Sequence, residues 1–241
     1  MNPSIHEQLM RQLRLHGMLD SWQTLLESRT YQNLSLTEGL QHLLQAEQLD
    51  REDRRVKRLR SAAGFRYQAS LQELIYSASR GLDKNTIALL ADGRYIDHGQ
   101  AILISGSTGS GKSFLASALG HQGCQLGYRV RYFNMQKLNR QLALARADGS
   151  ILKLLSVIAK TQLLILDDFG LSPLDTQQRL DLLDIVEDRH QKMATILVSQ
   201  LPVSSWYDVI GESTVADAIL DRLIHTAHRF ELSGESMRKK Q

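Results

Sequence analysis

The sequence predicts an α/β fold, in which a parallel β-sheet is flanked by helices and is preceded by a small all-helical domain. After about residue 95, short apolar runs alternate with helical segments, as is typical of a parallel sheet covered on both faces. A loop rich in glycine and serine joins the first apolar run to a helix. Up to about residue 80 only helical periodicity is visible, so the first part of the chain is expected to fold separately.

The composition is that of a globular chain, with 42% hydrophobic and 23% charged residues among 241. A formal net charge of +3 is too small to establish a nucleic-acid partner by itself. No apolar stretch approaches the roughly 18 residues of a membrane span and no signal peptide is evident, so we expect a cytoplasmic protein without a membrane partner. The single cysteine, Cys124, favours a reducing compartment, and its simplest role is that of a buried, inert thiol.

Three helices are predicted in the first part of the chain. Residues 5–15 carry apolar side chains at every fourth position, and residues 19–28 form a second helical segment after the interruption HGML. Ser35 is followed by Glu38 at the spacing of a capping box, which opens a third helix that continues to residue 63. Because a core this small buries little surface, we expect it to depend on the rest of the chain or on a partner.

The second part of the chain supplies the strands of the predicted sheet. We place the domain boundary between a helical domain, residues 1–65, and an α/β domain, residues 66–241. The helices between the strands are expected to start at Lys112 and to cover 138–147, 176–190 and 214–224. The expected strands are 100–105, 128–134, 162–167, 194–200 and 227–232.

The loop after the first strand matches G-x-x-x-x-G-K-[ST], the pattern of a phosphate-binding loop (P-loop). Glycine reaches backbone angles that let consecutive amides face one anion, and the following helix adds free N–H groups and the positive end of its dipole. Lys112 is expected to reach the β- and γ-phosphates of ATP, and the Ser113 hydroxyl to ligate Mg²⁺. The flanking strand and helix argue against a glycine-rich turn that binds nothing. The loop residues are Gly106, Ser107, Thr108, Gly109, Ser110, Gly111, Lys112 and Ser113.

Two acidic residues end the third predicted strand, within LLILDDFG. The carboxyl edge of an open parallel sheet is where its ligands bind. Asp167 is therefore predicted to hold Mg²⁺, directly or through water, and Asp168 to orient or deprotonate the attacking water. A helix cap or solvent-facing charge is the alternative role for two adjacent acids.

The motifs GSTGSGKS, LLILDDFG, TILVSQLP, ILDRLI and SGESMRK occur in the order seen in the initiator and helicase-loader branch of the AAA+ ATPases. The chain most resembles the IstB-type helper ATPases of bacterial insertion sequences, and next the DnaC-type helicase loaders. The resemblance covers nearly the whole chain, including the helical N-terminal segment. It implies an AAA+ P-loop fold, with ATP and Mg²⁺ as ligands and assembly of several copies.

The resemblance also implies roles for residues beyond the loop and the acids. Ser199 or Gln200 is similar to the first sensor, which positions the hydrolytic water, and the choice between them stays open. Arg222 is similar to the arginine finger that reaches a neighbouring subunit's nucleotide, although a solvated or locally paired arginine is the alternative. Arg238 resembles the second sensor, and it is so close to the last residue that little or no C-terminal lid is expected.

The acid pair departs from the family pattern, because many AAA+ proteins have Asp-Glu where this chain has Asp167-Asp168. The shorter Asp168 is expected to hold water less well, so hydrolysis is expected to be slow, as suits a switch.

Two groups of basic residues are candidate contacts to DNA. The segment 51–60 holds six basic and two acidic residues, and a salt-bridged surface involving Lys57 is an equally weighted alternative. A second group follows the second predicted strand. No aromatic residues are interleaved for base stacking, so we expect salt-sensitive phosphate contacts. The candidates are Arg54, Arg55, Lys57, Arg58, Lys137, Arg140 and Arg146.

Four functions are compared. The first is an ATP-dependent helper of transposition that oligomerises on duplex DNA and recruits or activates a transposase, with hydrolysis driving disassembly. The second is a DnaC-like replicative helicase loader that prefers single strands. The third is a small-molecule kinase, for which no lid or acceptor site is evident, and the fourth is an assembly module that binds ATP without cleaving it.

Overall fold

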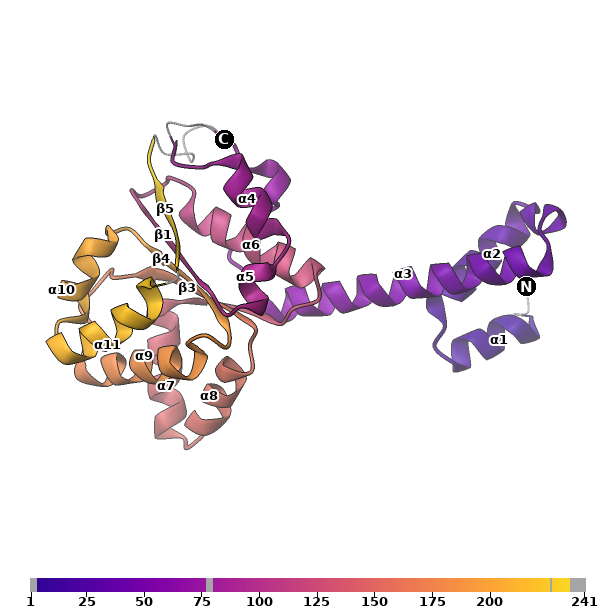
Figure 1. Cartoon of the computed structure of the whole chain (residues 1–241). Coiled ribbons are helices and arrows are strands. Elements are labelled where there is room, and N and C mark those ends of the chain that lie inside the picture. Colours follow the sequence, from indigo (N-terminus) through magenta and orange to yellow (C-terminus); the bar gives the residue numbers. More distant parts are fainter. Residues whose placement is uncertain (1–3, 77–79, 226, 235–241) are drawn as a thin grey trace. The chain divides into compact units, whose positions relative to one another are not determined.

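The computed structural model describes residues 4–76, 80–225 and 227–234, and the chain divides into two compact units, Met1–Arg58 and Leu59–Gln241 (Figure 1). The division falls earlier than the boundary expected between residues 65 and 66. The reason is that the long helix α3, Leu36–Ala63, belongs to both units, since its last residues pack on the core of the second unit.

The first unit contains α1 (Ile5–Gln12), α2 (His16–Glu27), the 3₁₀ turn η1 (Thr30–Asn33) and the first part of α3. The interruption between α1 and α2 lies earlier than predicted, at Arg14, whose φ of 58° breaks the helix. The capping box at Ser35 is confirmed, because the Ser35 N–H donates to Glu38 Oε2 at 2.8 Å and the Glu38 N–H donates to Ser35 Oγ at 3.3 Å.

Helix α2 crosses α3 at close range, and glycine is required at the crossing. A Cβ at Gly17 would lie 2.4 Å from the Ala46 carbonyl oxygen. The apolar side chains of α1 do not share this contact: Ile5 is 74% and Leu9 49% exposed. The apolar periodicity of the first predicted helix thus marks a face that the first unit itself leaves open.

The second unit is built on a parallel sheet of five strands in the described residues, in the order β2-β3-β4-β1-β5. Each lies where the sequence predicted a strand, because its apolar run is bounded by turn or helix signals. The strands are β1 (Ala101–Gly106), β2 (Val130–Asn134), β3 (Leu163–Phe169), β4 (Ala194–Ser199) and β5 (His228–Leu232).

Helices cover both faces of the sheet, as alternation along the strands requires (Figure 1). Ile102, Ile104 and Ile165 face the core under α4, α5 and α6, whereas Leu103 and Leu164 face the core under α7 to α11. The helices are α4 (Lys84–Ala91), α5 (Arg94–Asp97), α6 (Lys112–Gln125), α7 (Met135–Ala147), α8 (Ile151–Ala159), α9 (Thr176–Arg189), α10 (Trp206–Ile210) and α11 (Ser213–Ile224), with 3₁₀ turns η2 (Leu71–Glu73) and η4 (Val203–Ser205). Helices α4, α5, α8 and α10 were not predicted; α8 is short and nearly all apolar, so periodicity does not identify it.

Cys124 is buried on α6, and burial raises the pKa of its thiol to about 11, which fits the inert role expected for it. No helix within the described ranges combines the length and the apolar character needed to cross a membrane.

A buried arginine ties the last turn of α9 to the amino edge of the sheet. Arg189 is 2% exposed and donates to the carbonyl oxygens of Ile158 and Thr161, at 2.8 and 2.7 Å, and to Thr195 Oγ1 at 3.0 Å. Burial lowers its pKa to about 9, which leaves the guanidinium charged at neutral pH. These acceptors satisfy the buried charge, so the residue connects α8, α9 and β4.

Replacing Arg189 by methionine is expected to lower the free energy of unfolding by about 2 kcal/mol or more, because buried carbonyl oxygens lose their donor. Urea denaturation followed by circular dichroism measures the change. The matched control is Arg94→Met, since Arg94 is 81% exposed and forms an ion pair with the nearby Asp92. A loss for Arg189→Met no larger than the roughly 0.5 kcal/mol of a surface substitution would contradict the assigned role.

Candidate functional site

The loop between β1 and α6 has the backbone of a phosphate-binding loop. Gly106, Gly109 and Gly111 have φ of 143°, 84° and 94°, values that side chains disfavour. A Cβ at Gly106 would lie 2.1 Å from the carbonyl oxygen of Leu232 in β5. The start of the loop is therefore confined against the neighbouring strand, and α6 directs its first N–H groups toward the loop.

The side chain of Lys112 turns back over this loop. Its Nζ donates to the carbonyl oxygens of Gly106 and Ser107 at 2.7 and 2.8 Å, and the residue is 7% exposed. A buried ammonium needs acceptors, and these carbonyls keep it within the concave side of the loop. This is where an anion held by the loop would meet a positive charge.

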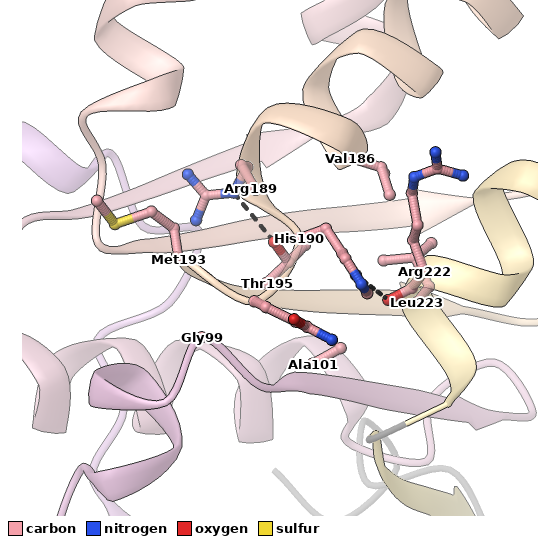
Figure 2. Close-up of a pocket in the computed structure, with 10 residues that line it drawn as sticks. Gly99, Ala101, Val186, Arg189, His190, Met193, Thr195, Arg222 and Leu223 are labelled. Atoms are coloured by element: carbon pink, nitrogen blue, oxygen red, sulfur yellow. Dashed lines mark hydrogen bonds between the residues drawn. The ribbon is translucent and has the colours of Figure 1, made fainter.

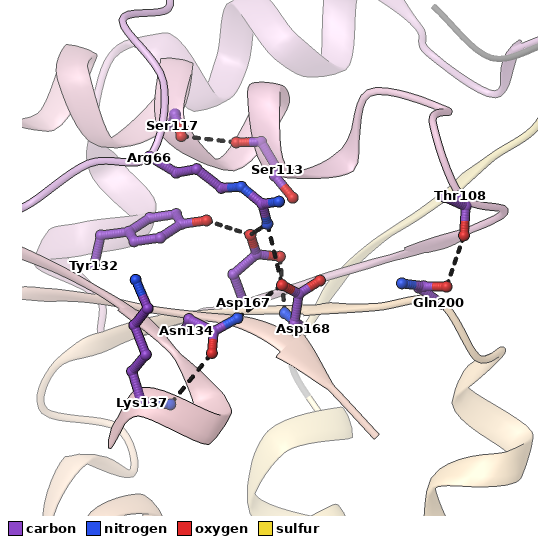
Figure 3. Close-up of polar contacts among 10 residues, drawn as sticks. All are labelled: Arg66, Thr108, Ser113, Ser117, Tyr132, Asn134, Lys137, Asp167, Asp168 and Gln200. Atoms are coloured by element: carbon purple, nitrogen blue, oxygen red, sulfur yellow. Dashed lines mark hydrogen bonds and ion pairs between the residues drawn. The ribbon is translucent and has the colours of Figure 1, made fainter. Parts of the chain in front are cut away.

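The two acids at the end of β3 converge on one arginine, although successive strand residues normally face opposite sides. A bulge interrupts the pairing of β3 with β4 between Leu166 and Phe169, and Asp168 has a φ of 62°. Arg66 Nη1 lies 3.1 Å from Asp168 Oδ2 and 3.6 Å from Asp167 Oδ2 (Figure 3). The backbone irregularity thus brings both carboxylates to the same side.

Strand β2 supplies two further contacts to the acids (Figure 3). The Tyr132 hydroxyl donates to Asp167 Oδ2, and burial together with that negative charge raises the pKa of Tyr132. Asn134 donates from Nδ2 to Asp168 Oδ2 at 2.7 Å, while its Oδ1 caps α7 by accepting from the Lys137 N–H. Sequence reasoning missed both residues, although an Asn after a strand and before a helix signals a cap at the carboxyl edge.

The donors at this edge fit Mg²⁺, which prefers oxygen ligands and takes one or two carboxylates together with phosphates and waters. Asp167 is fully buried, and the Ser113 hydroxyl lies on the first turn of α6 above it (Figure 3). Within the described residues no group of three or more His, Cys, Asp or Glu side chains could enclose a metal ion. The acids also already attract a cation of the chain itself, the guanidinium of Arg66.

The two candidates for the first sensor have different environments. Ser199 is buried, donates to the Phe169 carbonyl oxygen at 2.7 Å and accepts from the Leu201 N–H at 3.0 Å, so it joins the ends of β3 and β4. Gln200 is exposed and accepts from Thr108 Oγ1 of the phosphate-binding loop at 2.7 Å (Figure 3). Only Gln200 therefore contacts the loop.

Arg222 lies at the other edge of the sheet. It is in the last turn of α11 and lines a small pocket with Ala101 and Thr195, from the starts of β1 and β4 (Figure 2). Its guanidinium donates to the Ala218 carbonyl oxygen at 2.8 Å and pairs with Glu187. Because the phosphate-binding loop follows the end of β1, Arg222 and this loop lie at opposite ends of that strand. Arg238 lies outside the described residues.

Comparison with known proteins identifies the family of the chain. Residues 8–241 match the model of the family described as IstB-like ATP binding protein. A putative insertion sequence ATP-binding protein of Sinorhizobium fredii is 45% identical over 227 residues, which are 94% of this chain and 93% of that protein. The chain belongs to the IstB-like ATP-binding protein family. This confirms the resemblance seen in its motifs.

Solved structures show that the IstB-like chain has the AAA+ P-loop fold. The DnaC helicase loader matches with a TM-score of 0.55 at 20% identity, over 73% of this chain and 99% of that chain. The replication initiator DnaA, bound in its structure to AMPPCP and single-stranded DNA, matches with a TM-score of 0.57 at 20% identity, over 72% and 53% of the two chains.

The basic candidates of the IstB-like chain differ in their surroundings. Arg54 lies 2.7 Å from Asp50 and 3.7 Å from Glu47. Also on α3, Lys57 lies 3.9 Å from Asp53, and Arg58 donates to the Arg54 carbonyl oxygen. On α7, Arg146 pairs with the buried Asp181. Arg55, Lys137 and Arg140 are exposed. The acids on α3 thus engage part of the basic segment, as the salt-bridge alternative expects, while α7 keeps exposed basic side chains.

Substitution of the two sensor candidates should separate their roles. Ser199→Ala is expected to lower the free energy of unfolding by about 1–3 kcal/mol, because a buried carbonyl and N–H lose their partner. Gln200→Ala is expected to leave stability within about 0.5 kcal/mol of the parent, since the side chain is exposed. Parallel urea titrations measure both, and each variant is the control for the other. Equal losses of stability would contradict the distinction.

Proposed function

We propose that the IstB-like chain is an ATPase that uses ATP binding to assemble and hydrolysis to disassemble. The observation that supports this most is the arrangement at the carboxyl edge of the sheet. There the loop after β1 with Lys112, the acid pair of β3 and Gln200 after β4 lie at the same edge of the sheet. Family relatives are named ATP-binding proteins, and hydrolysis is the further step that these residues support.

Each residue has a role that follows from its chemistry. The loop amides and Lys112 would bind the phosphates, and Ser113 with Asp167 would hold Mg²⁺, which when bound neutralises charge on the phosphates. Asp168 would orient or deprotonate the attacking water, and Gln200, as the first sensor, would position that water. Asp168 Oδ2 already accepts hydrogen bonds from Arg66 and Asn134, which restrains the carboxylate and suits slow turnover.

The arginine finger would come from a neighbouring copy. Arg222 lies at the edge of the sheet opposite the nucleotide site, so a head-to-tail contact between copies would bring it to the next subunit's phosphates. Such a finger typically contributes about 10³–10⁵ in rate. Its partner Glu187 would be exchanged for the phosphates.

The biological role that we propose is that of a transposition helper. The relative from Sinorhizobium fredii is named an insertion sequence ATP-binding protein, which supports a protein that oligomerises on duplex target DNA and recruits or activates a transposase. The exposed Lys137 and Arg140 on α7 would contact phosphates without reading sequence. A DnaC-like helicase loader is the second candidate, and the likeness of fold to DnaC favours it.

A mixing experiment tests the shared active site. Arg222→Ala and Asp168→Asn are each expected to lower steady-state ATP turnover by about 10³-fold or more. Mixed in equal amounts, they should recover turnover, because roughly one interface in four joins an intact acid pair to an intact Arg222. A phosphate-release assay measures the rates. The control is a mixture of Lys112→Ala with Asp168→Asn. Both substitutions lie on the nucleotide-binding side of the interface, so no pairing of these two variants restores a complete site. A mixture no more active than its components would overturn assembly through Arg222.

Sizing on DNA tests the helper role. With a non-hydrolysable ATP analogue and duplex DNA, light scattering should show assemblies of several copies, whereas ADP should leave small species. Assembly should weaken steeply with salt, because phosphate contacts release counterions. Lys112→Ala, which should not hold the nucleotide, is the control. A chain that remains monomeric on duplex with saturating analogue would overturn the proposal, and preference for single strands would favour the loader.

A further inference from the structure

The acid pair is unusual because the chain brings two carboxylates together and then supplies its own cation. Asp168 has a φ of 62°, a value uncommon outside glycine, and such conformations persist where surrounding contacts hold them. Like charges at close range repel, so the arrangement needs a positive neighbour. Arg66 provides it, at 3.1 Å from Asp168 Oδ2 and 3.6 Å from Asp167 Oδ2.

The backbone on both sides of Arg66 is fixed. Phe65 packs on α6 at Gly120, where a Cβ would lie 2.4 Å from the Phe65 ring, and it contacts the ring of Tyr132 edge-on. The Tyr67 carbonyl oxygen lies 3.1 Å from His121 Nε2. The side chain of Arg66 is nevertheless 40% exposed, so its guanidinium can swing into solvent while the backbone stays in place.

The guanidinium lies against the two carboxylates that would hold a metal. Asp167 Oδ2 already accepts from Tyr132, and Asp167 Oδ1 accepts from the Asp168 N–H at 2.8 Å. These two hydrogen bonds take about half of the acceptor capacity of the Asp167 carboxylate. Two positive charges about 4 Å apart also repel each other strongly in a partly buried site.

We propose that Arg66 is an internal counter-cation that competes with the divalent metal of the nucleotide for Asp167 and Asp168. It offsets part of the negative charge of the acids before the metal arrives and leaves them when the metal binds. Arg66 therefore weakens the affinity for metal and strengthens the binding of a nucleotide that carries no metal. This inference rests on the proposed function, since it takes the acid pair as the metal site.

Two affinities that should change in opposite directions test the proposal. In Arg66→Ala with saturating ADP, the Mn²⁺ concentration at half-binding, measured by the electron paramagnetic resonance of free Mn²⁺, should fall about tenfold relative to the parent chain. In EDTA, the affinity for a fluorescent ADP should fall, because the acids then face the phosphates without a counter-charge. A loss of fold would weaken both, so the opposite signs exclude a merely structural effect.

Two further variants serve as controls. Arg66→Lys keeps a positive charge and should remain within a few-fold of the parent in both measurements. Arg94→Ala removes an equal charge from an exposed position that faces only Asp92, and it should change neither affinity.

The outcomes separate this inference from the proposed function. If the parent chain binds Mn²⁺ with ADP and Arg66→Ala leaves the Mn²⁺ midpoint unchanged or raises it, the competition is overturned while the ATPase proposal stands. If the parent chain binds no metal with ADP and Lys112→Ala does not alter ADP binding, the proposed function and this inference both fail.

Discussion

A buried carboxylate at the end of a central strand is the constraint around which this site is organised. Asp167 is fully buried. Removing an ion from water costs on the order of several kcal/mol of free energy unless hydrogen bonds and opposite charges replace its hydration. The replacements come from three places: the Tyr132 hydroxyl on the neighbouring strand, the Asp168 N–H turned inward by the bulge, and the Arg66 guanidinium. The unusual backbone conformation of Asp168 therefore helps to stabilise the buried Asp167 carboxylate, because it directs the Asp168 N–H toward that carboxylate.

The direction of the parallel sheet separates the proposed catalytic groups. Its carboxyl edge carries the phosphate-binding loop, the acid pair and Gln200, whereas its amino edge carries Arg189 and Arg222. At the amino edge, Arg189 is buried and all of its contacts given above are with hydrogen-bond acceptors of the protein, so it stabilises the fold. Arg222, in contrast, is partly exposed and pairs with the exposed Glu187. Of these two arginines, only Arg222 can exchange its partner for a group on another molecule.

Local patterns in the sequence predicted the sheet and the centre of the site, and contacts between distant segments supplied the rest. The phosphate-binding loop and Asp167 are recognisable because their chemistry lies within a few consecutive residues. Arg66 is 102 positions from Asp168 and Tyr132 is 35 from Asp167, so no spacing reveals them. Ser199 and Gln200 look equivalent in sequence, and only their contacts in the fold, with the Phe169 carbonyl oxygen and with Thr108 respectively, tell them apart. The apolar repeat of α1 predicted a helix correctly, but periodicity cannot say whether its face is covered by the same chain.

Arg66 and Arg222 each pair with an acid that the proposed mechanism would require them to leave, and the burial of that acid decides which separation costs more free energy. The pair of Arg222 and Glu187 is exposed at 28% and 49%, and such surface pairs contribute about 0–1 kcal/mol. In the proposed head-to-tail contact, Arg222 would therefore leave Glu187 at little cost. Arg66 contacts Asp167, whose side chain is 1% exposed, and a charge left alone there is costly. Release of Arg66 thus requires a cation to take its place, whereas release of Arg222 requires only a competing anion. In the assembly that we propose, the metal-bearing nucleotide, and not the contact between subunits, would therefore set the energetic threshold.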